Sequence, residues 1–224
     1  IYMRQIKVFL LVFLFSFTKL LADDQIKFLE WKKNFRILAI ENGISEKTFD
    51  LTMNNVKFLP KVIEYDRYQP EFYEDTKTYV SKRTSKKKVK KGLEFYKKNI
   101  ELINKVEKKY SIEKELLLSL MGIETNYGTY VGKMDILSSL STLSFDKRRS
   151  AFFTNELLIL LKLIDEGQID YETLYGSWAG AFGFFQFMPS TIKNHAIDFN
   201  SDNYIDLKNP KDAYASAANY LKKM

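Results

Sequence analysis

Apolar residues recur at helical spacing along almost the whole chain after residue 25, and this periodicity limits the folds open to it. Ile26, Leu29, Phe35 and Leu38 lie along one face of a helix that Gly43 would end. No regular alternation of strand and helix patterns is present in the sequence. The pattern therefore predicts an all-α fold. The expected helices cover residues 25–43, 45–54, 86–110, 111–125 and 146–167.

Capping residues and breakers mark the ends of these helices. Ser111 and Asp146 are expected at helix N-termini, because a short polar side chain can accept a hydrogen bond from a free backbone amide there. Gly167 is expected to follow the end of the last of these helices. Pro60 and Pro70 interrupt residues 58–72, so we expect that segment to be irregular.

The residue types present argue against several kinds of site. The chain has 224 residues, of which 46% are hydrophobic, so it can form one sizeable core. It contains no cysteine, which excludes disulfides, thiolate chemistry and cysteine-based zinc sites. Its single histidine, His195, argues against a Ser-His-Asp triad or a histidine-rich metal centre. We expect no organic cofactor.

Residues 1–22 have the order of a secretory signal peptide. Arg4 and Lys7 precede an apolar run over residues 8–17, and Ala22 provides a small residue for cleavage. The run is short for a membrane span, which needs about 20 residues. An uncleaved anchor is the alternative. We expect export, cleavage after Ala22, and a soluble periplasmic protein of a Gram-negative bacterium without an integral membrane span.

A basic stretch, "SKRTSKKKVKKGLEFYKK", covers residues 81–98 in a chain of formal net charge +7. Such a stretch can attract an anionic polymer, for example an acidic cell-wall glycan. A solvated helix face is the simpler interpretation and the one we favour. No nucleic-acid-binding motif accompanies the stretch, so we expect no nucleic-acid partner.

Glu124 ends a strongly apolar helix in the stretch "MGIETNYG". A helix C-terminus carries partial negative charge, and burial makes ionisation of a carboxyl group costlier still. A carboxyl group held there tends to keep its proton, as a general acid must. The alternative is an ordinary solvated glutamate.

A glycine-rich stretch, "YGSWAGAFGFFQFMPST", differs from the helical segments around it. Gly176, Gly180 and Gly183 are interspersed with aromatic residues, and Pro189 precedes another expected helix. Glycine permits unusual dihedral angles and lets a ligand approach the backbone closely. This stretch is therefore a candidate binding loop.

Four pieces, in this order and spacing, resemble the membrane-bound lytic murein transglycosylase B family. They are "GIETNYG", "STLSFDKRRSAFF", "GSWAGAFGFFQFMPS" and "AIDFNSDNYIDLKNPKDAYASAANYL". The family consists of bacterial enzymes with a lysozyme-like helical fold that cleave the glycan strands of peptidoglycan. The resemblance covers roughly residues 25–224 and implies a monomeric catalytic domain over residues 23–224. Because further cleft residues of the family lie beyond the last residue, we expect this domain to be truncated at its C-terminus.

The resemblance implies a set of site residues. Glu124 matches the catalytic glutamate. The residues that match the lining of the substrate cleft are Ser177, Gln186, Arg148, Arg149, Tyr220 and Tyr79. The aromatic rings of Tyr127 and Trp178 could stack on sugar faces. Trp178 stands where the family commonly has tyrosine, and Phe185 where it commonly has proline.

The stretch "DFNSDNYID" resembles an EF-hand-like calcium loop. Asp198, Asn200 and Asp202 occupy alternate positions, so a tight loop would turn their oxygens inward. Asn209 stands at loop position twelve in place of the usual glutamate. Asn203 replaces the usual glycine, and asparagine tolerates the left-handed conformation. The ligands implied are Asp198, Asn200, Asp202, the backbone carbonyl of Tyr204, and Asp212. An acidic turn without a metal is the alternative.

Three functions are compatible with these observations. The first is a lytic transglycosylase that cleaves the β-1,4 bond between N-acetylmuramic acid and N-acetylglucosamine and forms 1,6-anhydromuramoyl ends. The second is a hydrolytic muramidase, which needs a nucleophile or a positioned water. The third is a non-catalytic wall-binding module. Asp135 and Asp146 are the available second acids, but we interpret them as a loop residue and a helix cap. The sequence favours the first function, with peptidoglycan glycan strands as partner.

Overall fold

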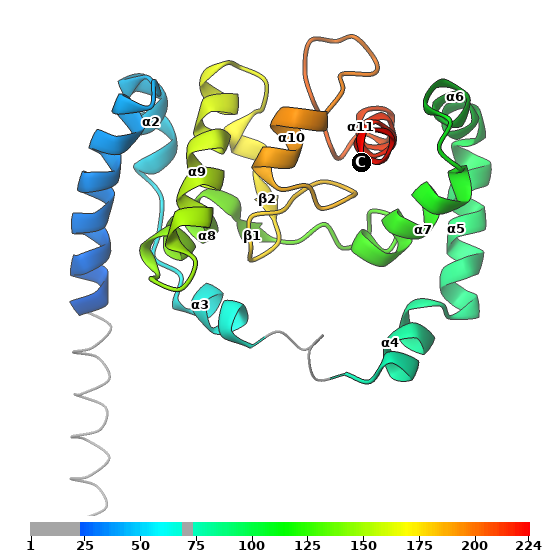
Figure 1. Cartoon of the computed structure of the whole chain (residues 1–224), viewed down its shortest axis with the longest axis horizontal. Coiled ribbons are helices and arrows are strands. Elements are labelled where there is room, and N and C mark those ends of the chain that lie inside the picture. The colour runs from blue at the N-terminus through cyan, green and yellow to red at the C-terminus, as the bar shows by residue number, and fades with distance from the viewer. Residues whose placement is uncertain (1–22, 69–73) are drawn as a thin grey trace, which may run out of the picture. The chain divides into compact units, whose positions relative to one another are not determined.

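The computed structural model describes residues 23–68 and 74–224, which fall into two compact units (Figure 1). The predicted signal peptide, residues 1–22, lies outside the described residues. In the first unit, residues 23–41 are helical, as expected, and Gly43 follows with a φ of +79°. Three aromatic rings stack along this helix, with centroids of Phe28 and Trp31 5.2 Å apart and of Trp31 and Phe35 5.1 Å apart.

The second unit, residues 44–224, is mainly helical, which confirms the predicted fold class. Its two strands have two residues each and pair antiparallel, with Met134 opposite Gly176. The elements described in it are α2 (Glu46–Met53), α3 (Pro60–Arg67), α4 (Thr76–Arg83), α5 (Lys86–Lys98), α6 (Ile100–Tyr110), α7 (Lys114–Thr125), β1 (Met134–Asp135), α8 (Ile136–Phe145), α9 (Ser150–Asp165), a 3₁₀ turn (Tyr171–Thr173), β2 (Tyr175–Gly176), α10 (Pro189–His195) and α11 (Pro210–Lys223).

The core of this unit is built around α8, which packs side by side with α9 (Figure 1). Residues 136–144 of α8 are buried on every face. Two of its polar side chains are satisfied by the chain that precedes α3, because Ser138 Oγ accepts from the backbone amide of Lys57 and Thr142 Oγ1 from that of Leu59, both at 3.0 Å. These bonds fix the start of α3 against the core.

The helix expected after Ser45 is confirmed as α2, but residues 60–67 are helical where an irregular segment was expected, and Pro70 lies outside the described residues. Ser45 caps α2 and its Oγ accepts from the backbone amide of Thr48 at 3.2 Å. Pro60 does not break a helix; it begins α3 at the first helical position. Proline is suited to that position, because its fixed φ is helical and its missing amide hydrogen would have no intrahelical partner.

Three predicted helix boundaries are also wrong. The expected helix over residues 86–110 is divided at Asn99 into α5 and α6. Ser111 does not begin α7; it ends α6 in the left-handed conformation, with a φ of +60°. Asp146 follows the end of α8, and α9 begins only at Ser150. Ser111 and Asp146 were both expected to begin a helix, and each instead follows the end of the preceding one.

None of the helices in the described part of the chain is long and apolar enough to cross a membrane.

Candidate active site

Glu124 is the last but one residue of α7, as the sequence predicted. The chain turns sharply directly after the helix, because Asn126, Tyr127 and Gly128 have consecutive positive φ values of +49°, +59° and +76°. Glycine is required at the third position, where a Cβ atom would also lie 2.8 Å from the ring of Phe184. This turn sets the direction in which Glu124 leaves the helix.

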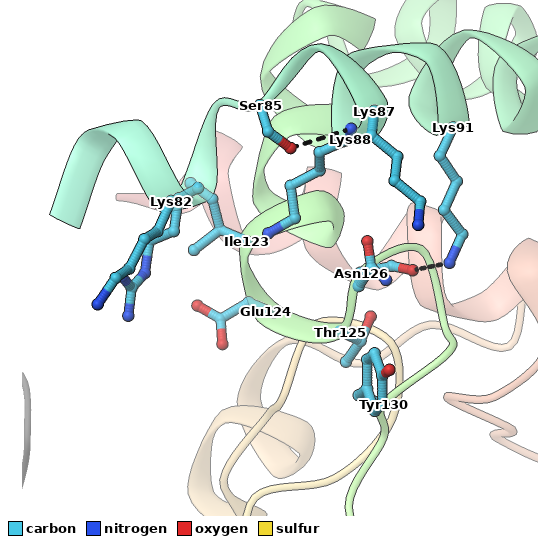
Figure 2. Close-up of a pocket in the computed structure, with 11 residues that line it drawn as sticks. Lys82, Ser85, Lys87, Lys88, Lys91, Ile123, Glu124, Thr125, Asn126 and Tyr130 are labelled. Atoms are coloured by element: carbon cyan, nitrogen blue, oxygen red, sulfur yellow. Dashed lines mark hydrogen bonds between the residues drawn. The ribbon is translucent and has the colours of Figure 1, made fainter. Parts of the chain in front are cut away.

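A cavity of about 780 Å³ lies beside the end of α7 (Figure 2). Its described lining includes Glu124 and no second carboxylate. Five cationic side chains from α4 and α5 share the cavity with Glu124, and Figure 2 shows Lys87, Lys88 and Lys91 extending from α5 toward the end of α7. The five residues are Lys82, Arg83, Lys87, Lys88 and Lys91. The remaining lining residues are Ser85, Ile123, Thr125, Asn126 and Tyr130.

The Glu124 carboxyl group is poised to hold a proton. Solvent reaches the side chain, which is exposed at the cavity, but the protein atoms around it displace enough water to raise the pKa of its carboxyl group. Within the described residues, no donor forms a hydrogen bond or ion pair with this carboxylate that would oppose the effect. A raised pKa and an open approach from solvent are what a general acid needs.

The turn after Glu124 is attached to two neighbouring segments. Lys91 Nζ donates to the carbonyl oxygen of Asn126 at 2.8 Å and also to Thr129 Oγ1. Thr125 Oγ1 donates to the carbonyl oxygen of Phe184 at 2.8 Å, which joins the end of α7 to the glycine-rich loop. These bonds hold the catalytic candidate between α5 and that loop.

Tyr127 is packed between two helices. A Cβ atom on Gly92 of α5 would lie 2.3 Å from the Tyr127 hydroxyl oxygen, and one on Gly122 of α7 would lie 2.7 Å from it. The Tyr127 ring also stacks on Phe95, with centroids 6.1 Å apart, and burial raises the pKa of its hydroxyl group. Tyr127 does not line the cavity described above. Its contacts are those of a packing residue, and the sugar-stacking role expected for it has no support here.

The glycine-rich loop lies against the segment that follows Glu124. Gln186 has a φ of +50°, and its Nε2 donates to the carbonyl oxygens of Gly183 at 2.8 Å and Val131 at 3.3 Å. Ser177 Oγ accepts from the backbone amide of Ala181 at 3.0 Å. Gly132 approaches the backbone of β2 so closely that a Cβ atom would lie 2.0 Å from the Gly176 carbonyl oxygen. Ser177 and Gln186 are thus positioned in one loop next to the Glu124 turn.

Arg148 and Arg149 both bind the buried Asp66 of α3. Arg148 Nε donates to Asp66 Oδ2 at 2.6 Å, its Nη2 donates to the Asp66 carbonyl oxygen at 2.5 Å, and Arg149 donates to Asp66 Oδ1. Burial opposes ionisation of Asp66, but the hydrogen bonds from the two arginines outweigh it, so the pKa of Asp66 is lowered. Both guanidinium groups remain partly exposed while they fix α3 to the start of α9.

The other aromatic residues expected at the cleft each contact a different neighbour. Trp178 of the glycine-rich loop packs against Tyr65 of α3, with centroids 6.4 Å apart. The Arg83 guanidinium lies 3.6 Å from the ring centroid of Tyr79 on α4, which brings Tyr79 next to a residue of the cavity. Tyr220 of α11 packs on Phe187 of the glycine-rich loop, with centroids 5.8 Å apart.

The acidic loop after α10 is closed by its own hydrogen bonds. The Asp198 carboxylate accepts from the backbone amides of Asp202 and Asn203, and Asn200 Nδ2 donates to Asp202 Oδ2 at 2.6 Å. Tyr204 donates its backbone amide to Asp202 Oδ1 at 3.0 Å. Asn203 has the left-handed conformation expected of it, with a φ of +67°.

Asp212 of α11 is fully buried beneath this loop. Its carboxylate accepts from the backbone amides of Phe199 at 2.9 Å and Asp206 at 3.1 Å. Burial raises the pKa of Asp212, and the nearby charge of Asp198 raises it further. Among the described residues, no group of three or more histidine or acidic side chains converges to hold a metal ion. The predicted EF-hand-like set also includes the amide of Asn200 and the backbone carbonyl of Tyr204, and all of its donors are oxygen atoms, as a calcium site requires.

Comparison with known protein families identifies the chain. The Transglycosylase SLT domain family matches residues 27–224. The chain belongs to this family.

Three relatives are similar to this SLT domain. Membrane-bound lytic murein transglycosylase B of Escherichia coli (strain K12) is 40% identical over 135 residues, which are 60% of this chain and 37% of that protein. The crystal structure of SltB3 from Pseudomonas aeruginosa in complex with NAG-NAM-pentapeptide is 35% identical, with a TM-score of 0.84 over 88% of this chain and 53% of that one. The E. coli lytic transglycosylase Slt35 in complex with calcium is 32% identical, with a TM-score of 0.77 over 86% of this chain and 62% of that one.

The SLT domain thus spans less than two thirds of each of these relatives. The similarity to solved structures confirms the lysozyme-like helical fold expected from the sequence.

The basic residues of the cavity were missed as site residues from the sequence. The favoured interpretation of residues 81–98 was a solvated helix face, and part of that face instead lines the cavity beside Glu124. One signal could have revealed this. The first turn of α5 consists of Lys86, Lys87 and Lys88, and positive charges are unfavourable at a helix N-terminus, so helix stability does not explain them.

Proposed function

We propose that this SLT domain is a lytic transglycosylase that cleaves the β-1,4 bond between N-acetylmuramic acid and N-acetylglucosamine in peptidoglycan. The observation that carries the proposal is Glu124, a carboxyl group with a raised pKa at an open cavity whose described lining holds no second carboxylate. The named relatives support it, because two are lytic transglycosylases and the third is a complex with NAG-NAM-pentapeptide.

Glu124 would act twice in this reaction. As an acid it gives its proton to the glycosidic oxygen, so the N-acetylglucosamine side leaves as an alcohol. As a base the resulting carboxylate takes the proton of the C6 hydroxyl of the muramic acid residue, whose oxygen then bonds to C1 of the same sugar. The proton returns to Glu124, no water is consumed, and the product carries a 1,6-anhydro bridge. An intramolecular hydroxyl has a high effective molarity and outcompetes water.

Asp135 and Asp146, the two acids considered for a hydrolytic muramidase, are engaged elsewhere. Asp135 caps α8 by accepting from the backbone amide of Ser138 at 2.6 Å. Asp146 accepts from Arg67 Nη2 at 2.8 Å. Because a two-carboxylate hydrolysis needs a second free carboxylate near the bond, these contacts favour the transglycosylase over the muramidase. The complex of SltB3 with NAG-anhNAM-pentapeptide is in line with this choice.

The glycan would extend along the glycine-rich loop. In this proposal Ser177 and Gln186 give hydrogen bonds to sugar hydroxyl and acetamido groups, and Trp178, beside the exposed Tyr65, gives a stacking surface. The other residues that we propose to line the cleft are Arg148, Arg149, Tyr79 and Tyr220. Tyr127 is not part of this set, because it is packed between α5 and α7.

We also propose that calcium binds the loop of Asp198, Asn200 and Asp202, with the carbonyl of Tyr204 and with Asp212. The oxygen-only donor set supports this, and so does the relative Slt35, which is known in complex with calcium. The closeness of the Asp198 and Asp212 charges adds support, since a cation would neutralise their repulsion. Calcium would stabilise the fold and take no part in the chemistry.

Finally, we propose that residues 1–22 direct export and that the domain over residues 23–224 acts in the periplasm as a monomer. The basic, apolar and small residues of this segment, in that order, support the proposal. The substrate, peptidoglycan, would be met in that compartment.

Mass analysis of digested peptidoglycan sacculi tests the proposed function. We expect muropeptides with 1,6-anhydromuramic ends, one water lighter than hydrolytic products. Glu124→Gln should lower the rate at least 10²- to 10⁴-fold, the usual contribution of general acid–base catalysis. Glu115→Gln, on the exposed face of the same helix, is the matched control and should leave the rate unchanged. Reducing muramic ends as the main product would instead identify a muramidase.

A further inference from the structure

The residue that follows Glu124 in the chain, Thr125, has a buried hydroxyl group with partners in two segments. Thr125 is the last residue of α7 and is fully buried, although its side chain is polar. Its Oγ1 donates to the carbonyl oxygen of Phe184 at 2.8 Å and accepts from the backbone amide of Gly128 at 3.1 Å. The hydroxyl group therefore joins the end of the catalytic helix both to the turn after it and to the glycine-rich loop.

The shorter bond that this hydroxyl group donates leaves its own helix. A threonine in a helix commonly donates to the carbonyl oxygen four residues earlier. For Thr125 that oxygen belongs to Met121 and lies 3.3 Å away, and it already accepts from the backbone amides of Asn126 and Tyr127. The Phe184 oxygen is closer and belongs to a distant part of the chain. The main contact of the hydroxyl group is thus a tertiary one.

The bond to Gly128 closes the turn that follows Glu124. Three consecutive residues of this turn have positive φ values, and two of them are not glycine, so the turn carries conformational strain. Such a backbone persists only where neighbouring contacts hold it. The Thr125 hydroxyl group provides one of these contacts, and the ring of Phe184, which lies against Gly128, provides another.

Phe184 lies at the tip of the glycine-rich loop, in the same four-residue turn as Gln186. Gln186 donates its backbone amide to the carbonyl oxygen of Gly183 at 3.3 Å and its Nε2 to the same oxygen at 2.8 Å. The backbone amide of Phe184 donates to the carbonyl oxygen of Leu207 at 2.9 Å. The tip of the loop is therefore held from two sides, and Thr125 provides the bond on the side of the catalytic helix.

We propose that Thr125 is a positioning residue, whose hydroxyl group fixes the Glu124 carboxyl group relative to the sugar-binding turn of Gln186. This inference rests on the proposed function, in which Glu124 protonates the glycosidic oxygen while Gln186 binds the sugar. The two groups come from distant segments, so their spacing depends on the bonds that join those segments. Proton transfer needs heavy atoms about 3 Å apart, and a misplacement of about 1 Å can cost about 10²-fold in rate.

Thr125→Val tests the two bonds, because it removes the hydroxyl group and keeps the shape of the side chain. On purified sacculi we expect kcat to fall about 10- to 100-fold while KM changes less than about threefold, because the sugar ligands stay in the loop and only the alignment of the acid is lost. Thr125→Ser keeps the hydroxyl group and should retain kcat to within about threefold of the wild-type value.

Two further variants separate position from stability. Thr52→Val is the matched control, because Thr52 is also buried, but its hydroxyl group donates to carbonyl oxygens of its own helix, α2. This variant should leave kcat unchanged. Thr125→Cys decides the question if Thr125→Val does not fold. Cysteine has nearly the size of serine, but its thiol is a weak donor, so kcat should fall with cysteine and not with serine.

All rates are measured at a temperature at which circular dichroism shows each compared variant to be folded. Wild-type kcat in Thr125→Val or in Thr125→Cys would overturn the inference and leave the proposed function intact. So would a loss of the same size in Thr125→Ser, a loss of the same size in Thr52→Val, or a change confined to KM. Failure of the wild-type protein to cleave sacculi would instead overturn the proposed function itself.

Discussion

At the scale of single residues, Glu124 links catalysis to stability. Its pKa is raised in the folded protein, so the folded state keeps the proton to a higher pH than the unfolded chain does. The unfolded chain loses this proton near pH 4.3, and from there upward the free energy of unfolding falls until the raised pKa is passed. The protein thus gives up stability at neutral pH to hold a carboxyl group that catalysis needs.

We expect Glu124→Gln to raise the melting temperature at pH 7, because glutamine cannot ionise in this site. The gain over the wild-type protein should shrink toward zero near about pH 3.5, where both states of the wild-type protein hold the proton. Calorimetry at the two pH values measures this. Glu115→Gln on the same helix serves as the control. A destabilised Glu124→Gln protein at pH 7 would contradict the interpretation.

Asp66 presents the opposite case, since its pKa is lowered by Arg148 and Arg149. The stabilisation from these bonds is present above the ordinary aspartate pKa of about 3.9 and is lost as pH falls through the lowered value. Asp66→Asn should lower the free energy of unfolding at pH 7 by about 1.5–3 kcal/mol, the range for hydrogen bonds to a charged group. Urea denaturation at pH 7 and at about pH 2 measures the difference.

The exposed pair of Lys61 and Glu64 on the same helix provides the comparison for Asp66. Glu64→Gln should have little effect on urea denaturation, because exposed ion pairs contribute little. If both variants changed stability equally, the binding of Asp66 by two arginines would not be what holds α3 against α9.

At the scale of elements, the presence of a helix was easier to predict from the sequence than the residues at which it begins and ends. The apolar periodicity predicted α7 and α9, because both bury a continuous face. It could not separate α5 from α6. The apolar pattern continues across Asn99, whereas the helical backbone is interrupted at that residue. Ser111 and Asp146 were assigned to the wrong ends, since a short polar residue between two helices can follow one as well as precede the next.

The same limit explains why α4 and the cationic lining of the Glu124 cavity were not predicted. In α4 no side chain is buried, so its sequence lacks an apolar stripe. The basic residues of α5 follow a helical pattern whether they face solvent or a cavity. Which of them approach Glu124 depends on how α5 packs against α7, and a single helix pattern does not contain that information.

The acidic loop before α11 carries a prediction about calcium. Calcium should raise the melting temperature, since a ligand that binds only the folded state stabilises by about 2.7 kcal/mol at a concentration of 100 times its Kd. Asp198→Ala and Asp202→Ala should each abolish the response, while Glu172→Ala, an exposed acid in another loop, should retain it. Identical melting curves in calcium and in chelator would exclude this site.

At the scale of the whole molecule, the four pieces quoted from the sequence are brought into contact by the fold. Thr125 binds the backbone of Phe184, and Tyr220 packs on Phe187, so two of the pieces meet the glycine-rich loop directly. The piece with Arg148 and Arg149 binds α3, whose Tyr65 packs on Trp178 of that loop. The family resemblance implied that residues of these pieces line one cleft, whereas helical periodicity carries no information about which helices meet.

Export is a property of the whole chain and has a direct test. If residues 1–22 are a cleaved signal, protein recovered from a Gram-negative host should be periplasmic and should begin at Asp23. Cell fractionation and N-terminal sequencing measure both features. Substituting Glu for Lys7 would weaken the basic start of the segment and should slow processing. Recovery of the intact N-terminus would favour the membrane anchor instead.

The packing of Tyr127 makes positions 92, 122 and 127 depend on one another during evolution. A methyl group at Gly92 or at Gly122 would overlap the hydroxyl end of Tyr127, so a change at either glycine forces this packed side chain to shift while the tyrosine is present. A smaller side chain at position 127 would free the space and make alanine acceptable at both. Among homologous sequences, we therefore expect larger side chains at positions 92 and 122 only where the side chain at position 127 is smaller. Along a lineage, we expect the tyrosine to be replaced before either glycine.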